Sequence, residues 1–234
     1  MQTKEAIVLA GGLGTRLKGV ISDIPKPMAP VAKQPFLQYI LAYLKQQGIE
    51  RVILSVGYKY EVIQEFFGDN YLGLNLIYSV EETPLGTGGG MRLAIEHLKS
   101  DRAFIINGDT FFDVQLPRME QFAISKRADL CLALKSMKNF DRYGSVVVED
   151  NKISSFREKQ LVKEGLINGG VYLVKTSFFT DFEVGQKFSF EQDLMEKQVG
   201  KQNILGFVSD TYFIDIGIPE DYAQANKDFE NFSL

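Results

Sequence analysis

The chain has 234 residues, of which 45% are hydrophobic and 24% are charged, with 21 Gly, 7 Pro and one Cys. These proportions are ordinary for a globular protein and exclude disordered, collagen-like and coiled-coil chains. A chain of this length hides roughly 70 to 75% of its unfolded surface, so it can fold without a metal or a disulfide. The net charge of −4 argues against nonspecific nucleic-acid binding. We therefore expect one domain, residues 1–234, with no nucleic-acid partner.

The N-terminal segment contains no signal peptide and no membrane span, because its first apolar strand breaks at Gly11. We expect a cytoplasmic protein without a membrane partner. Cys131 lies in an apolar run and is predicted to be a core strand residue. Residues 1–35 are unusually basic, which indicates a local anion site; they carry Lys4, Arg16, Lys18, Lys26 and Lys33 against Glu5 and Asp23.

The first half of the chain alternates apolar strands with amphipathic helices. The expected elements are a strand at 6–10, a helix at about 36–47, a strand at 51–56, a short helix near 60–67, a strand at 75–80, a helix carrying Met91, Ala94, Ile95 and Leu98, and a strand at 102–107. Strands separated by helices predict right-handed crossovers and a parallel sheet.

The second half contains shorter strands with close turns, which are typical of antiparallel pairing. After a helix near 117–127 we expect strands at 129–135, 143–149, 152–157 and 166–174, a helix near 189–199, strands at 204–208 and 211–214, and a helix from Pro219. The fold class is an α/β, Rossmann-like doubly wound mixed sheet, mainly parallel, with an antiparallel extension. Residues up to about 127 form one half and residues from about 128 to 234 the other.

A glycine-rich loop follows the first strand. Gly11, Gly12 and Gly14 let backbone N–H groups approach an anion, and Arg16 supplies a cation nearby. Leu17 breaks the dinucleotide-binding fingerprint, and no Gly-Lys-Ser/Thr of a Walker loop follows. The loop therefore predicts a phosphate site of another kind, with an ordinary strand-to-helix turn as the alternative.

Lys26 lies between two prolines, Pro25 and Pro27. These prolines hold the backbone extended, which lowers the entropy lost when the ammonium group binds a phosphate. Taken by itself, the segment is better explained by a solvated lysine in a proline-rich loop.

Six motifs in order resemble the sugar-phosphate nucleotidyltransferases, and they cover residues 5 to about 222. They are Gly11-Gly12-x-Gly14-Thr15-Arg16-Leu17 with Pro25-Lys26-Pro27-Met28, Pro84-Leu85-Gly86-Thr87-Gly88-Gly89, Asn107-Gly108-Asp109, Glu158-Lys159, Asn168-Gly169-Gly170-Val171-Tyr172, and Phe213-Ile214-Asp215-Ile216-Gly217-Ile218-Pro219. The short chain and the second motif are similar to mannose- and heptose-type guanylyltransferases. The resemblance implies a GT-A-like fold and an enzyme that transfers GMP from GTP to a sugar 1-phosphate.

The expected acceptor is D-glycero-α-D-manno-heptose 1-phosphate, and the products are a GDP-sugar for cell-surface glycan synthesis and pyrophosphate. Mannose 1-phosphate, or UTP, dTTP or CTP as donor with another hexose 1-phosphate, remain alternatives, as does a non-catalytic nucleotide-sugar sensor. The reaction brings two polyanions together, so Mg²⁺ is the expected cofactor, with Asp109 and Asp215 as its ligands at strand ends. A sugar phosphate is largely ionised near neutral pH, so no general base is required, and His97 is expected to be structural.

The resemblance also assigns roles to individual residues. Arg16 would stabilise the β- and γ-phosphates, and Lys26 the α-phosphate, so that Arg16, Lys26 and Asp109 form the catalytic set. The nucleotide-binding set is Leu9, Ala10, Gly11, Gly12, Gly14, Thr15, Arg16, Glu81, Gly86 and Thr87. The sugar-phosphate set is Gly108, Glu158, Lys159, Asn168 and Gly170.

Glu81 is the predicted guanine reader, because a carboxylate can accept from guanine N1–H and N2–H₂ together. A solvated loop at Glu81 and Glu82 is the alternative. A homodimer is possible, since Phe178, Phe179 and Phe182 could cover a partner; we favour a core position for them.

Overall fold

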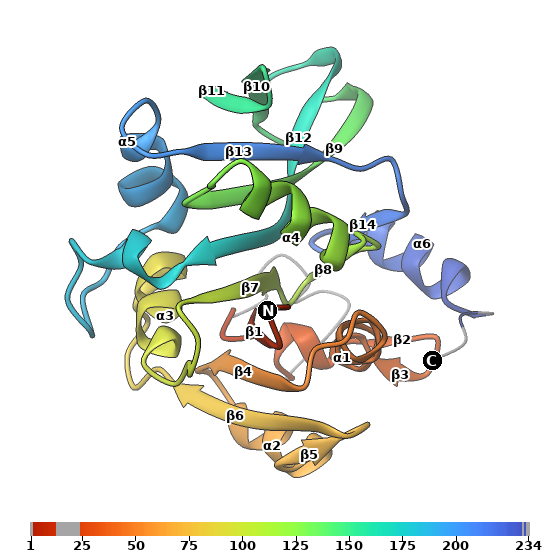
Figure 1. Cartoon of the computed structure of the whole chain (residues 1–234). Helices are drawn as coiled ribbons and strands as arrows, with labels where there is room; N and C mark the ends of the chain where they lie inside the picture. The colour runs from red at the N-terminus through yellow and green to blue at the C-terminus, as the bar shows by residue number, and fades with distance from the viewer. Residues whose placement is uncertain (1, 13–23, 231, 233–234) are drawn as a thin grey trace.

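The computed structural model describes residues 2–12, 24–230 and 232. Strands of the first half form a parallel sheet in the order β6-β4-β1-β7 (Figure 1). Their bounds are β1 Glu5–Leu9, β4 Arg51–Val56, β6 Leu74–Val80 and β7 Arg102–Asn107. The order reverses between β1 and β7, and open α/β sheets bind ligands at such a point, beyond the carboxyl ends of the strands.

The second half continues the same sheet with antiparallel strands. The long strand β12 (Val162–Lys175) pairs antiparallel with β7 on one side and with β9 (Leu130–Phe140) on the other. Beyond β9 lie β13 (Ile204–Val208), β11 (Lys152–Arg157) and β10 (Ser145–Glu149), the last two at the top of Figure 1. The mixed α/β sheet is confirmed. Antiparallel pairing takes a larger share than expected, because β12 inserts between β7 and β9.

Helices cover both faces of the sheet, as a doubly wound fold requires. One core gathers apolar residues of α1 (Phe36–Gln46), α2 (Tyr60–Phe67) and α4 (Leu116–Ser125), together with Phe229 after α6 (Pro219–Asp228). The other core gathers those of α3 (Gly86–Ile95) and the π-helical turn η4 (Phe190–Met195). Successive side chains of β1 point to opposite faces of the sheet, so that Ala6 and Val8 lie in the first core and Ile7 lies in the second.

The remaining elements are short. They are η2 (Lys26–Met28), β2 (Pro30–Val31), β3 (Gln34–Pro35), β5 (Asn70–Tyr71), β8 (Thr110–Phe112), η3 (Thr176–Phe179), α5 (Glu196–Gln198) and β14 (Phe213–Asp215). β8 pairs antiparallel with β14, with Asp215 opposite Thr110. This small ladder was not expected, and it brings two motifs from opposite halves of the chain side by side.

Several expectations about boundaries were wrong. The helix expected to carry Leu98 ends at Ile95, and the glycine-rich motif forms its first turn from Gly86. The helix expected near 189–199 is divided into η4 and α5. Phe178 and Phe179 are buried, and Phe182 stacks on Phe188, so the preferred core position is confirmed. Cys131 is fully buried, and burial raises the pKa of its thiol to about 12.

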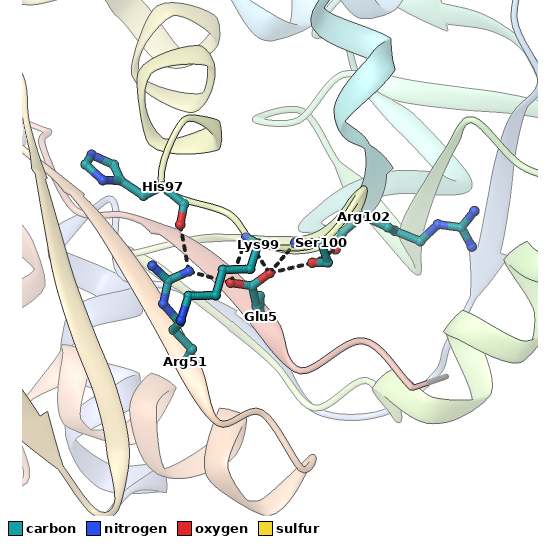
Figure 2. Close-up of polar contacts among 6 residues, drawn as sticks. All are labelled: Glu5, Arg51, His97, Lys99, Ser100 and Arg102. Carbon is teal, nitrogen blue, oxygen red and sulfur yellow. Dashed lines mark hydrogen bonds and ion pairs between the residues drawn. The ribbon is translucent and has the colours of Figure 1, made fainter.

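A polar cluster joins the amino ends of the parallel strands, on the edge away from their carboxyl ends (Figure 2). The carboxylate of Glu5 accepts hydrogen bonds from Arg51, from the backbone N–H groups of Lys99 and Ser100, and from the Ser100 hydroxyl. Arg51 also donates to the carbonyl oxygen of His97 at 2.6 Å. The cluster therefore fixes the starts of β1 and β4 to the turn before β7, and His97 takes part in it through its backbone carbonyl group.

Candidate active site

A cavity of about 740 Å³ opens at the carboxyl ends of β1, β4, β6 and β7. Its lining is Leu9, Gly11, Gly12, Lys26, Pro27, Ser55, Gly57, Tyr58, Glu81, Glu82, Pro84, Gly86, Thr87, Gly90, Asn107, Gly108, Asp109 and Glu191. The cavity lies where the strand order reverses, as the fold predicts. Most of the predicted nucleotide-binding set lines it.

Not every predicted site residue is placed at the cavity wall; Asp215, Asn168 and Gly170 do not line it. Gly14, Thr15 and Arg16 fall outside the described residues. Ala10 is buried beside the cavity, where its N–H donates to the Ser55 carbonyl oxygen at 2.7 Å. Glu158 and Lys159 follow β11 on an exposed turn and do not line the cavity.

Lys26 and Asp109 meet at the centre of the site, with Nζ 2.6 Å from Oδ2. Asp215 adjoins them, because the N–H of Ile216 donates to the Asp109 carbonyl oxygen at 3.0 Å. Burial raises the pKa of Asp215, and the negative charge of Asp109 adds to this, while the positive charge of Lys26 opposes it. Two neighbouring carboxylates repel each other, and a bound cation would relieve this repulsion.

Glu81 projects from the end of β6 into a space left by glycines. Its Oε2 accepts from the Leu85 N–H at 2.9 Å, and its Oε1 lies 3.4 Å from the Ser55 hydroxyl. A side chain at Gly90 would place a Cβ atom 2.6 Å from Oε1. Burial raises the pKa of Glu81, against the lowering effect of the Leu85 and Ser55 hydrogen bonds. The glycine at position 90 is therefore required for the position of this carboxylate.

The start of α3 packs closely against the segment before η4. Gly88 N–H donates to the Phe188 carbonyl oxygen at 3.1 Å, and a Cβ atom at Gly88 would lie 2.2 Å from the Phe188 ring. Thr87 Oγ1 donates to Glu191 Oε2 at 2.8 Å. The Gly89 N–H also donates to the Phe188 carbonyl oxygen, at 3.4 Å. This close packing of the first turn of α3 leaves Gly86 and Thr87 at the wall of the cavity.

A buried hydroxyl organises the other end of the site. Tyr172 accepts from Asn168 Nδ2 at 2.8 Å and also bonds with Asn107. Asn168 Oδ1 accepts from the Gly170 N–H at 3.0 Å. Gly170 has φ +71°, and a Cβ atom there would lie 2.7 Å from the Asn107 amide nitrogen. The Asn168–Gly170 turn is thus held against the end of β7.

Three site residues were missed by the assignments from sequence. Ser55 is a buried polar residue among the apolar residues Val52, Ile53, Leu54 and Val56 of β4, and this contrast could have indicated it. Glu191 has no such signal, because it reaches the cavity only through tertiary packing. Tyr143 lies close to the aspartates: burial raises the pKa of its hydroxyl, and the charge of Asp215 adds to this.

Comparison with known proteins agrees with this geometry. Residues 5–231 match the family model described as nucleotidyl transferase. The chain is 50% identical to D-glycero-alpha-D-manno-heptose 1-phosphate guanylyltransferase of Aneurinibacillus thermoaerophilus, over 97% of this chain and 99% of the relative. It is 36% identical to mannose-1-phosphate guanylyltransferase of Mycobacterium tuberculosis, over 96% of this chain and 64% of the relative. The structure of HddC from Yersinia pseudotuberculosis complexed with GMP-PN superimposes with a TM-score of 0.87 at 37% identity, covering 97% and 100% of the two chains.

The chain therefore belongs to the nucleotidyl transferase family. The resemblance inferred from the six motifs is confirmed, and so is the fold that it implied. Within the part of the chain that the structure describes, no helix is long and apolar enough to cross a membrane.

Proposed function

We propose that this protein transfers GMP from GTP to D-glycero-α-D-manno-heptose 1-phosphate, forming a GDP-sugar for cell-surface glycan synthesis and pyrophosphate. The observation that carries the proposal is the 50% identity to an enzyme of that name over nearly the full length of both chains. The cavity supports it, since it offers a glycine-lined wall, the ammonium group of Lys26 and the carboxylate of Asp109 within one space, with Asp215 adjoining Asp109. We place the enzyme in the cytoplasm, where nucleoside triphosphates are available.

The nucleotide is assigned to the wall formed by Leu9, Ala10, Gly11 and Gly12, by the first turn of α3 at Gly86 and Thr87, and by Glu81. Gly14, Thr15 and Arg16 complete the assignment, with Arg16 neutralising the β- and γ-phosphates. Glu81 would accept from N1–H and N2–H₂ of guanine, whereas uracil offers one N–H and two carbonyl oxygens that a carboxylate repels. Leu85 N–H holds one carboxylate oxygen in place, which orients the group before the base arrives.

The two aspartates fit a divalent cation. Asp109 and Asp215 lie at neighbouring strand ends, where burial and then the negative charge of Asp109 raise the pKa of Asp215. Among the described residues, no group of three acidic, histidine or cysteine side chains could hold a metal. A pair of carboxylates completed by water and phosphate oxygens is the usual arrangement for Mg²⁺. Bound there, Mg²⁺ would neutralise phosphate charge and align the two substrates.

The remaining chemistry is charge stabilisation and alignment. The sugar phosphate oxygen attacks the α-phosphorus, forming one P–O bond as the bond to pyrophosphate breaks. Lys26 would donate to the α-phosphate oxygens as negative charge builds there. The extended backbone expected for Lys26 was wrong, because Lys26 begins the 3-10 helix η2 after Pro25. Its hydrogen bond to Asp109 pre-positions the ammonium group.

The sugar phosphate is assigned to Gly108, Asn168 and Gly170 at the Tyr172 end of the site, and to Glu158 and Lys159. Lys159 would hold the phosphate group. Because Glu158 and Lys159 are exposed, they would reach the acceptor only if the turn after β11 moves toward the cavity. This part of the proposal is tested by the KM for the sugar phosphate in a Lys159→Ala variant, which should rise while the KM for GTP stays constant.

The function is tested by pyrophosphate release with GTP, UTP, dTTP, CTP and ATP against heptose, mannose and glucose 1-phosphates. We expect GTP with the heptose 1-phosphate to have the highest kcat/KM. Mannose 1-phosphate is the second candidate acceptor, because of the 36% identical relative. A higher kcat/KM for UTP or dTTP would refute guanylyl transfer, and absence of turnover with every pair would favour a nucleotide-sugar sensor.

A further inference from the structure

Glu191 places an acidic side chain in a cavity that must accept polyanions. It lies in η4, in the second half of the chain, and lines the cavity together with Lys26, Asn107 and Asp109. Within the described residues, no lysine or arginine forms an ion pair with it. An unneutralised carboxylate repels phosphate groups, so its place in the site needs another explanation.

One carboxylate oxygen of Glu191 is held from two sides. Oε2 accepts from Thr87 Oγ1 at 2.8 Å and lies 3.2 Å from the Ser189 hydroxyl. Thr87 Oγ1 in turn accepts from the Phe190 N–H at 3.0 Å. The Thr87 hydroxyl therefore donates its proton to the hydrogen bond with Glu191. The second oxygen, Oε1, has no hydrogen-bond partner among the described residues, so an oriented acceptor is left for a ligand.

Packing brings Glu191 close to the acceptor side of the cavity, because the ring of the preceding residue, Phe190, lies edge-on to the ring of Tyr172 with centroids 5.2 Å apart. The pKa of the buried Tyr172 hydroxyl is raised first by burial, then by the negative charge of Glu191, and further by Asp109. The same hydroxyl bonds with Asn168 and Asn107. Glu191 therefore acts on the segment that also carries Asn168 and Gly170.

We propose that Glu191 Oε1 accepts a hydrogen bond from a ring hydroxyl of the acceptor sugar, and that this contact helps to select the sugar. A carboxylate accepts strong hydrogen bonds from hydroxyl groups but repels a negatively charged phosphate. Glu191 is therefore expected to contact the sugar ring rather than the 1-phosphate. Through Thr87, the contact also joins the helix N-terminus assigned to the nucleotide with the sugar site. The inference rests on the proposed function.

The test compares Glu191→Gln and Glu191→Ala with the matched control Glu196→Gln, an exposed glutamate of α5 in the following turn. Loss of a hydrogen bond to a charged group costs about 1.5 to 3 kcal/mol, which corresponds to roughly a 10- to 150-fold change. We expect kcat/KM for the sugar phosphate to fall by about that factor in both variants, with KM for GTP within about twofold of the wild-type value. The control should be unchanged.

Deoxy analogues of the sugar phosphate give a second readout that does not depend on the variants' stability. At one ring position, removing the hydroxyl from the substrate should lower the activity of the wild-type enzyme. The Glu191→Gln variant should then have nearly the same activity with the deoxy substrate as with the normal one. If KM for GTP rises instead while KM for the sugar phosphate is constant, Glu191 only holds Thr87 and the proposal is wrong. The proposed function fails separately, when the wild-type enzyme forms no pyrophosphate with any sugar phosphate.

Discussion

The ammonium group of Lys26 lies 2.6 Å from Oδ2 of Asp109, although 83 positions separate the two residues in the sequence. Lys26 begins the short helix η2, and Asp109 follows the end of β7. Their side chains are 13% and 39% exposed, so the pair is partly shielded from water. The contact joins the proline segment to the carboxyl edge of the sheet before any substrate is bound.

Removing the charge of Asp109 should abolish turnover without unfolding the protein. In Asp109→Asn, Lys26 loses its charged partner and the aspartate pair with Asp215 becomes a single carboxylate. We expect kcat to fall by about 10³-fold or more, measured as pyrophosphate release at saturating Mg²⁺. Asp113→Asn is the control, because Asp113 is exposed in the same segment. Near-normal activity of Asp109→Asn would contradict the metal assignment.

The preference for GTP over UTP should depend on the charge of Glu81. In Glu81→Gln, one acceptor of the proposed guanine contact becomes a donor, so the ratio of kcat/KM for the two nucleotides should fall by about 10- to 100-fold. Glu82→Gln is the matched control, since Glu82 is an exposed neighbour that lines the same cavity. An unchanged ratio in Glu81→Gln would remove Glu81 from base recognition.

The same preference should decline in acid. Burial raises the pKa of Glu81, so the carboxylate gains its proton at a higher pH than an exposed glutamate with a pKa of about 4.3. The ratio of kcat/KM for GTP and UTP should be constant near neutral pH and should decrease as the pH falls through the raised pKa. Both nucleotides share the triphosphate titration, which therefore cancels in the ratio. A decrease that persists in Glu81→Gln would assign the titration to another group.

Gly108 should not tolerate a side chain. A Cβ atom there would lie 2.4 Å from the carbonyl oxygen of Leu9, to which the Gly108 N–H also donates. We expect Gly108→Ala to lower the free energy of unfolding by about 1 to 3 kcal/mol and to displace Asp109. Gly165→Ala is the control, because its nearest contact is the movable Val162 side chain at 3.2 Å. Urea denaturation measures the free energy of unfolding of both variants. Equal values would show that the backbone at Leu9 can shift to make room for the new side chain.

The Glu5 cluster of Figure 2 should make stability depend on pH. Burial alone would raise the pKa of Glu5, but hydrogen bonds from Ser100, Arg51 and Lys99 outweigh it and lower the pKa. The stabilisation is therefore complete above the unfolded-state pKa of about 4.3 and is lost as the pH falls through the folded-state value. We expect Glu5→Gln to cost about 1.5 to 3 kcal/mol at pH 7.

The difference in unfolding free energy between Glu5→Gln and the wild-type protein should shrink below about pH 4. Glu50→Gln, which removes an exposed ion pair with Lys4, should change stability by at most about 1 kcal/mol at any pH. A Glu5→Gln effect that does not vary between pH 7 and pH 3 would show that lost packing, not lost charge, causes it.

The sequence was sufficient to predict the class of fold, the protein family and many of the residues that line the cavity. Continuous apolar runs predict buried strands, and apolar residues spaced three or four positions apart predict helices. Residues that follow parallel strands lie at the same edge of the sheet, whatever the detailed packing. This is why Gly11, Glu81 and Asp109 could be placed together before any contact was known. The length of β9 and the β8–β14 pair could not be predicted, because short or polar strands carry weak patterns.

Contacts between distant segments were decided by tertiary structure alone. Glu191 reaches Thr87 across 104 positions, and no local pattern distinguishes it from the other glutamates on exposed helices. The raised pKa of Glu81 follows from burial beneath glycines that belong to a different element. The residues along the chain determined the family and the edge of the sheet at which the site lies. Packing, which depends on which faces become buried together, decided the hydrogen-bond partners of the site residues and raised the pKa values of Glu81 and Asp215.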